Sequence, residues 1–272
     1  MISSERNRYV FGRARKYLLE VEKGKVNDSM IDKHLNYWKE GKRNSINELL
    51  FGMLNSVQNK RGMWRTIGKL ENLCPYLENY DPGKITKKYG DDWSKDWEGL
   101  FMTIKNSYTP PGKMTIEKAR NPWVIFCKSA ISASSFLSKF SDINDFDRFV
   151  SQFYLNEYTR VSLPLLLDRE IFGLGFALAC DFLKENGYPK FVKPDVHIKA
   201  IFNGLEISLS DDDFQIFKDV IRFSESISEV PYVVDKLFWL VGSGNFYIDG
   251  VRIKTDRDKF INVVKKEMDT NL

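Results

Sequence analysis

Apolar residues recur every three to four positions along most of the chain, the spacing that places them on one face of an α-helix. The clearest helix begins at Ser45, where residues 45–48 (Ser-Ile-Asn-Glu) match a capping box. Its apolar positions are Ile46, Leu49, Leu50, Met53, Leu54 and Val57. The same spacing predicts helices within 1–40, over 123–140, 146–154, 163–172, 176–185, 211–223 and 231–240, and at the end of the chain.

Two stretches depart from this pattern. Between about 80 and 120, clusters of Pro, Gly and Asp predict loops around short helical pieces. Residues 246–253 instead alternate around Asp249-Gly250, which predicts two strands joined by a two-residue turn. The expected fold class is therefore mainly α, with one small C-terminal β-hairpin.

Composition agrees with a folded protein. The 272 residues are 43% hydrophobic and 29% charged, and no apolar run approaches the roughly 20 residues of a membrane-spanning helix. Residues 1–16 contain charged side chains from Glu5 onward and lack the apolar stretch of a secretory signal peptide. We therefore expect a cytoplasmic, nucleoid-associated protein without a membrane partner. A net charge of +4 is compatible with nucleic acid but does not select it.

The chain offers few ligands for a metal. Its cysteines (Cys74, Cys127 and Cys180) lie about fifty residues apart and share no ligand spacing with His34 or His197. We therefore expect no metal, no iron-sulfur cluster and no other cofactor.

A tight hairpin is predicted between the helices at 163–172 and 176–185, because only Gly173-Leu174-Gly175 separates them. Glycines there permit positive φ, and the N–H groups that open the second helix can bind an anion with the help of the helix dipole. This hairpin could grip a DNA backbone without reading its sequence, or it could be a plain turn between helices.

An aspartate follows this hairpin. Asp195 lies after Pro194 and before 196–198 (Val-His-Ile), so its side chain can cap the next helix by accepting from the N–H of His197 or Ile198. A capped carboxylate has a fixed orientation, which suits electrostatic stabilisation of a cationic transition state. Capping and catalysis are compatible roles.

Together these segments resemble the helix-hairpin-helix glycosylases, the superfamily of endonuclease III and 8-oxoguanine DNA glycosylase. The order and the 22-residue distance from Gly173 to Asp195 both match. Upstream, 48–58 (Glu-Leu-Leu-Phe-Gly-Met-Leu-Asn-Ser-Val-Gln) is similar to the family's first core helix. The matched pieces lie within about 46–200, whereas 81–122 and the residues after 205 match no known motif.

The resemblance implies a two-lobed helical fold, with one lobe at 46–186, which contains the hairpin at 163–186, and the other formed by 1–45 and 187–272. It also implies site residues. Asp195 would be the catalytic carboxylate, and His197 would support its loop. Gly173, Gly175, Phe176 and Ala177 would bind the DNA backbone, and Gln58 and Asn59 would fill the gap left by a flipped base, although both could equally be exposed polar residues at a helix end.

The family's bifunctional members carry a Schiff-base lysine two residues after the second hairpin glycine. Here that position is Ala177, so the sequence favours base hydrolysis without strand cleavage. A lysine elsewhere, such as Lys128, Lys193 or Lys199, could substitute, but the sequence selects none of them.

A flipped base needs aromatic faces to hold it. Trp123 and Phe126, on a helix rich in small residues, and Trp239, beside the turn at 242–244, are our candidates for this pocket, although most aromatics are expected in the core. The expected protein is a monomeric DNA N-glycosylase acting on duplex DNA that contains a damaged or modified base. The alternatives are a bifunctional glycosylase/lyase and a non-catalytic DNA-binding module.

Overall fold

The structure, a computed structural model, describes residues 4–271 and is mainly helical with one two-stranded antiparallel sheet. This confirms the predicted fold class. Contacts between Cα atoms divide the chain into two compact units, Arg43–Phe182 and Met1–Lys42 with Leu183–Leu272. Helix α10 (Phe176–Glu185) begins in the first of these and ends in the second.

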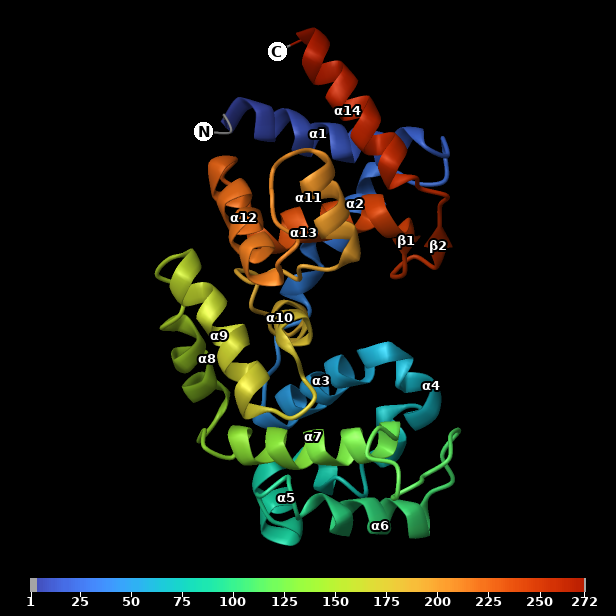
Figure 1. The fold of residues 1–272 in the computed structure, drawn as a ribbon, viewed down its shortest axis with the longest axis vertical. Helices are drawn as coiled ribbons and strands as arrows, with labels where there is room; N and C mark the ends of the chain where they lie inside the picture. Colours follow the sequence, from blue (N-terminus) through green and yellow to red (C-terminus); the bar gives the residue numbers. More distant parts are fainter. Residues whose placement is uncertain (1–3, 272) are drawn as a thin grey trace. The chain divides into compact units, whose positions relative to one another are not determined.

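The unit Arg43–Phe182 is built around α7 (Pro122–Leu137), which packs against α3 (Ile46–Gln58), α4 (Trp64–Ile67), α5 (Pro82–Tyr89), α6 (Trp97–Ser107) and α9 (Glu157–Glu170). Figure 1 shows α7 between α3 on one side and α5 and α6 on the other. The unit also contains α8 (Ile143–Ser151) and 3-10 turns at Lys60–Gly62, Leu70–Leu73 and Glu78–Tyr80. Small side chains along α7, including Ser129, Ser132 and Ala133, are buried, which confirms the prediction that this is a core helix.

Helix starts follow local capping. Ser45 Oγ accepts from Glu48 N at 3.2 Å, as predicted, but the Glu48 carboxylate accepts from Asn44 N rather than from Ser45 N. Helix α9 begins at Glu157, before the predicted 163, because Asn156 caps it with both bonds of a capping box. Pro164 therefore lies inside α9, where it removes one backbone hydrogen bond.

The other unit is built around α13 (Pro231–Ser243), which packs against α1 (Ser4–Glu20), α2 (Asp28–Asn36), α11 (Val196–Gly204), α12 (Asp213–Ser226) and α14 (Arg257–Asn271). A 3-10 turn, Tyr37–Lys39, follows α2. Most residues of α13 are apolar and buried. The side chains of Tyr232, Leu237 and Phe238 are fully buried. A helix that is apolar on nearly all sides belongs in the centre of a unit.

The β-hairpin exists but its turn was predicted wrongly. Strand β1 (Asn245–Phe246) pairs with β2 (Val251–Arg252) so that Phe246 faces Val251, which leaves four residues in the loop instead of two. Gly250 alone provides the positive φ, at 64°, whereas a two-residue turn of the predicted type needs positive φ at both central positions.

Among residues 4–271, no helix combines the length and the apolar character needed to cross a membrane.

Candidate functional site

The hairpin between α9 and α10 uses its two glycines differently. Both have positive φ, 82° at Gly173 and 61° at Gly175. A Cβ added to Gly173 would lie 2.8 Å from Ser129 Oγ, whereas one added to Gly175 would meet no atom within 4 Å. Gly173 therefore packs against α7, and Gly175 leaves open space on the outer side of the turn.

Hydroxyl groups of α7 hold this hairpin in place. Ser129 Oγ donates to Phe172 O at 2.7 Å, and Phe172 N donates to Ser132 Oγ at 2.9 Å. Lys60 Nζ donates to Gly173 O at 3.3 Å. The small side chains of α7 thus bind the backbone of the turn directly, which fixes where α10 begins.

The first turn of α10 follows Gly175 directly. Leu178 N and Ala179 N both donate to Gly175 O, at 3.1 and 2.9 Å, so the helical hydrogen bonds begin there. The N–H groups of a first helical turn lack intrahelical acceptors and lie at the positive end of the helix dipole. This turn contains the half-buried Phe176 and Ala177, the residues predicted to bind the DNA backbone.

Alanine substitutions at the two glycines should separate packing from backbone strain. Each should lower the free energy of unfolding by about 1–2 kcal/mol because of the left-handed backbone. Gly173→Ala should cost more than Gly175→Ala, because only its methyl group collides with Ser129 Oγ. Urea unfolding measures both variants, and equal losses would contradict the proposed packing of Gly173.

Asp195 is the N-cap of α11, as predicted. Its Oδ1 accepts from His197 N at 2.9 Å and from Ile198 N at 3.0 Å. Its Oδ2 makes no hydrogen bond within residues 4–271, and the side chain is half-buried. One carboxylate oxygen is therefore fixed by the backbone while the other remains available as an acceptor.

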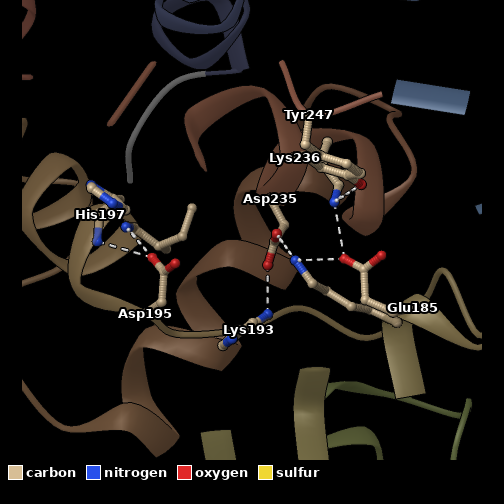
Figure 2. A network of polar contacts seen from close by, with 9 residues as sticks. Glu185, Lys193, Asp195, His197, Asp235, Lys236 and Tyr247 are labelled. Atoms are coloured by element: carbon tan, nitrogen blue, oxygen red, sulfur yellow. Dashed lines mark hydrogen bonds and ion pairs between the residues drawn. The ribbon is translucent and has the colours of Figure 1, made fainter. Parts of the chain in front are cut away.

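A buried ion pair holds the segment that precedes Asp195. Figure 2 shows Asp235, on α13, accepting from the backbone N–H of Lys193, two residues before the cap. The same carboxylate pairs with Lys184 Nζ, and these two side chains are only 1% and 4% exposed. Asp235 thus anchors the loop to the central helix of its unit.

A second buried lysine extends this network. Lys236 Nζ donates to Glu185 Oε1 at 2.9 Å and to the Tyr247 hydroxyl at 3.2 Å, and Lys184 lies 3.6 Å from the same glutamate oxygen. Rings of Tyr232, Trp239 and Tyr247 surround the Lys236 ammonium at 5.1–5.4 Å. The charges of two lysines and two carboxylates therefore balance one another in the network that holds Lys193 N, two residues before Asp195.

Burial and pairing act in opposite directions on these groups. Burial raises the pKa of Asp235, against the influence of Lys184 and of the Lys193 N–H. Burial lowers the pKa of Lys236, although Glu185 favours its charged form. For Glu185, burial raises the pKa, but the ammonium groups of Lys236 and Lys184 outweigh it and leave the pKa lowered.

His197 supports the loop through its backbone rather than through its ring. The N–H of His197 binds Asp195, whereas Nδ1 of the ring is buried with no hydrogen-bond partner in the described part of the chain. The ring packs against Gly242 of α13, where an added Cβ would lie 2.5 Å from His197 Cβ.

Gly242→Ala should therefore displace the start of α11. Overpacking a close contact typically costs about 1–3 kcal/mol, so the free energy of unfolding should fall within that range. The matched control is Gly12→Ala on α1, where an added Cβ meets nothing within 4 Å and stability should be unchanged or rise by about 0.5–1 kcal/mol. Equal free energies of unfolding in the two variants, measured by urea unfolding, would contradict the importance of this contact.

The base-pocket prediction is corrected for two of its three residues. Trp123 and Phe126 are fully buried and pack edge to face against each other, so neither ring has a face available to a base. Both belong to the core around α7. Trp239 is half-buried, and its ring lies against Tyr247 and Lys236.

The two predicted wedge residues differ in exposure. Asn59 is exposed and its Nδ2 donates to Asp181 Oδ2 at 3.4 Å. Gln58 is only 4% exposed, and its Nε2 donates to Gly68 O at 3.2 Å. Gln58 is thus not the exposed polar residue that its position at a helix end suggested.

The three lysines considered as substitutes for a hairpin amine have different surroundings. Lys128 is half-buried, with its ammonium 5.2–5.7 Å from the rings of Trp93, Trp97 and Phe172. Lys199 is paired with Asp213. Lys193 contributes its backbone N–H to the Asp235 anchor.

Sequence reasoning missed Asp235 and its partners. The signal was the pair Asp235-Lys236 inside an otherwise apolar helix, because charged residues are rarely buried unless they are paired. The partners come from the end of α10, which no local pattern connects to α13. Residues 4–271 contain no group of three or more His, Cys, Asp or Glu side chains that could hold a metal ion.

Comparisons with known proteins give limited results. No family model and no curated protein matches the chain. Among solved structures, the chain is similar to the Methanocaldococcus jannaschii 8-oxoguanine glycosylase/lyase in complex with 15mer DNA containing 8-oxoguanine. That match has 18% identity and a TM-score of 0.47, and covers 88% of this chain and 100% of the other.

Proposed function

We propose that the protein is a DNA N-glycosylase that hydrolyses the bond between a modified base and its deoxyribose in duplex DNA. The observation that carries this proposal is the state of Asp195: two backbone N–H groups orient one oxygen, and the other makes no hydrogen bond within residues 4–271. Such a carboxylate can stabilise the positive charge that develops on the sugar as the base leaves, and can position the attacking water.

The glycine hairpin supplies the second part of the proposal. The N–H groups at the start of α10 bind a backbone phosphate, and the open space beside Gly175 allows the strand to approach. Because such contacts carry no sequence information, the hairpin positions the DNA and leaves the choice of base to other contacts. Gly173 holds this turn against α7.

The proposed reaction stops at an abasic site. Ala177 provides no amine for a Schiff base, so neither an imine nor strand cleavage by β-elimination arises from the hairpin. Borohydride trapping on an abasic duplex tests this point, and a stable crosslink would assign the protein a lyase activity instead.

The activity itself is tested by incubating the protein with a panel of duplexes that contain oxidised, alkylated or deaminated bases. Mass spectrometry of the supernatant should identify a released base. A protein that binds these duplexes but releases no base from any of them would be a binding module, and the proposal would be wrong.

A further inference from the structure

The unit Arg43–Phe182 has a surface pocket of about 620 Å³ that none of the proposed catalytic groups uses. It lies between the face of α3 that carries Asn55 and Gln58, the start of α4, and the loop at Pro111. Pockets of roughly 300–1,000 Å³ are typical of sites for small molecules.

An exposed tryptophan forms one wall of this pocket. The side chain of Trp64 is 52% exposed, whereas Trp97 and Trp123 of the same unit are 7% and 0% exposed. The Arg65 guanidinium lies 5.1 Å from the centroid of the Trp64 ring. Phe51 and Leu70 add apolar surface, so a planar ligand would find an aromatic face to stack on.

Two amides provide hydrogen-bonding groups in the same pocket. Asn55 is exposed, and its side chain makes no hydrogen bond within the described part of the chain. Gln58 uses its Nε2 to bind Gly68 O, which leaves its amide oxygen as an acceptor. Side-chain amides carry both donors and acceptors, the groups that match the edges of nucleobases.

Basic side chains line the pocket, and a backbone hydrogen bond holds one of its walls. Arg65 and Lys69 have no ion-pair partner among residues 4–271, and they outnumber the one acidic residue of the lining, Glu71. The wall is held in place because Gly112 N donates to Thr66 O at 3.0 Å. A planar ligand that carries a phosphate therefore fits the pocket better than a neutral or cationic one.

We propose that this pocket binds an unstacked nucleobase of single-stranded DNA. Trp64 stacks on the base, Asn55 and Gln58 contact its edge, and Arg65 and Lys69 bind neighbouring phosphates. A free nucleotide shares this chemistry. The proposal goes beyond base excision, because it concerns binding by the unit Arg43–Phe182 and does not require Asp195.

Binding of a fluorescent 12-nucleotide oligothymidylate, measured by anisotropy with the full chain, tests this inference. Loss of one stacked base costs about 1–3 kcal/mol, so Trp64→Ala should bind roughly 5- to 150-fold more weakly. Trp64→Phe should keep most of the affinity. Met102→Ala, at an apolar position of α6 that is 41% exposed and lies outside the pocket, is the matched control and should bind normally.

Photocrosslinking with an oligonucleotide that contains 5-iodouracil then locates the contact, and we expect the adduct in residues 51–71. Competition with thymidine monophosphate distinguishes the two sources: displacement only by longer strands assigns the pocket to DNA, and equal displacement by the mononucleotide assigns it to a free nucleotide. Unchanged affinity in Trp64→Ala together with adducts elsewhere would overturn the proposal. A protein that crosslinks at Trp64 but releases no base would contradict only the proposed excision.

Discussion

Replacement of Asp195 by asparagine should slow base release by about two to four orders of magnitude, the range expected for a positioned electrostatic or acid-base group. Asparagine keeps a side-chain oxygen, so it can still accept from the N–H groups of His197 and Ile198 and cap α11. Folding and DNA binding should therefore change little. Single-turnover release of the base, with binding measured in parallel, separates the two effects.

The matched control is Asp212→Asn. Asp212 caps α12 in the same unit by accepting from Gln215 N at 3.2 Å, and it has no proposed role in chemistry. It should release the base at the wild-type rate. If Asp195→Asn were equally active, Asp195 would be a structural cap and nothing more.

Removal of the Asp235 carboxylate should have the largest effect on stability. Asp235→Ala leaves Lys184 without its closest partner in a site where both side chains are at most 4% exposed. Breaking a buried ion pair from one side typically costs about 3–5 kcal/mol of unfolding free energy. The loop before Asp195 also loses its anchor at Lys193 N, so base release should fall as well.

Two further variants separate these effects. The double change Lys184→Met with Asp235→Leu removes both charges, and should recover much of the stability, because a buried pair replaced by apolar residues is often nearly neutral. It cannot restore the bond to Lys193 N, so base release should stay slow. Asp235→Asn keeps an acceptor for that N–H and should release the base faster than Asp235→Ala at equal folded fraction. Recovery of full activity in the double variant would show that Asp235 acts only through stability.

The helices could be predicted because apolar spacing and capping depend on residues that are close together in the sequence. Apolar spacing and capping residues identified the helix after Ser45, the core helix with small residues and the glycine hairpin. The cap at Asp195 was predictable for the same reason, since donor and acceptor lie within three residues of each other. The turn of the β-hairpin was predicted wrongly from local sequence, because strand pairing, and not the Asp249-Gly250 pair, sets the length of the loop.

The surroundings of the candidate site could not be predicted, because they depend on contacts between distant segments. Lys184 and Asp235 lie 51 residues apart, and their helices meet only in the folded unit. Aromatic content alone likewise could not separate Trp123, which fills the core, from Trp64, which remains 52% exposed. Small residues next to aromatic ones, as on α7, can indicate close packing of helices as well as a pocket.

The most direct test of the central claim is mass spectrometry of the bases released from a panel of modified duplexes by the wild type and by Asp195→Asn. We expect the wild type to release one class of modified base and leave an intact abasic strand, and the variant to release the same base about 10²–10⁴ times more slowly. Equal release by both proteins, or no release by the wild type from any duplex that it binds, would contradict the proposed glycosylase.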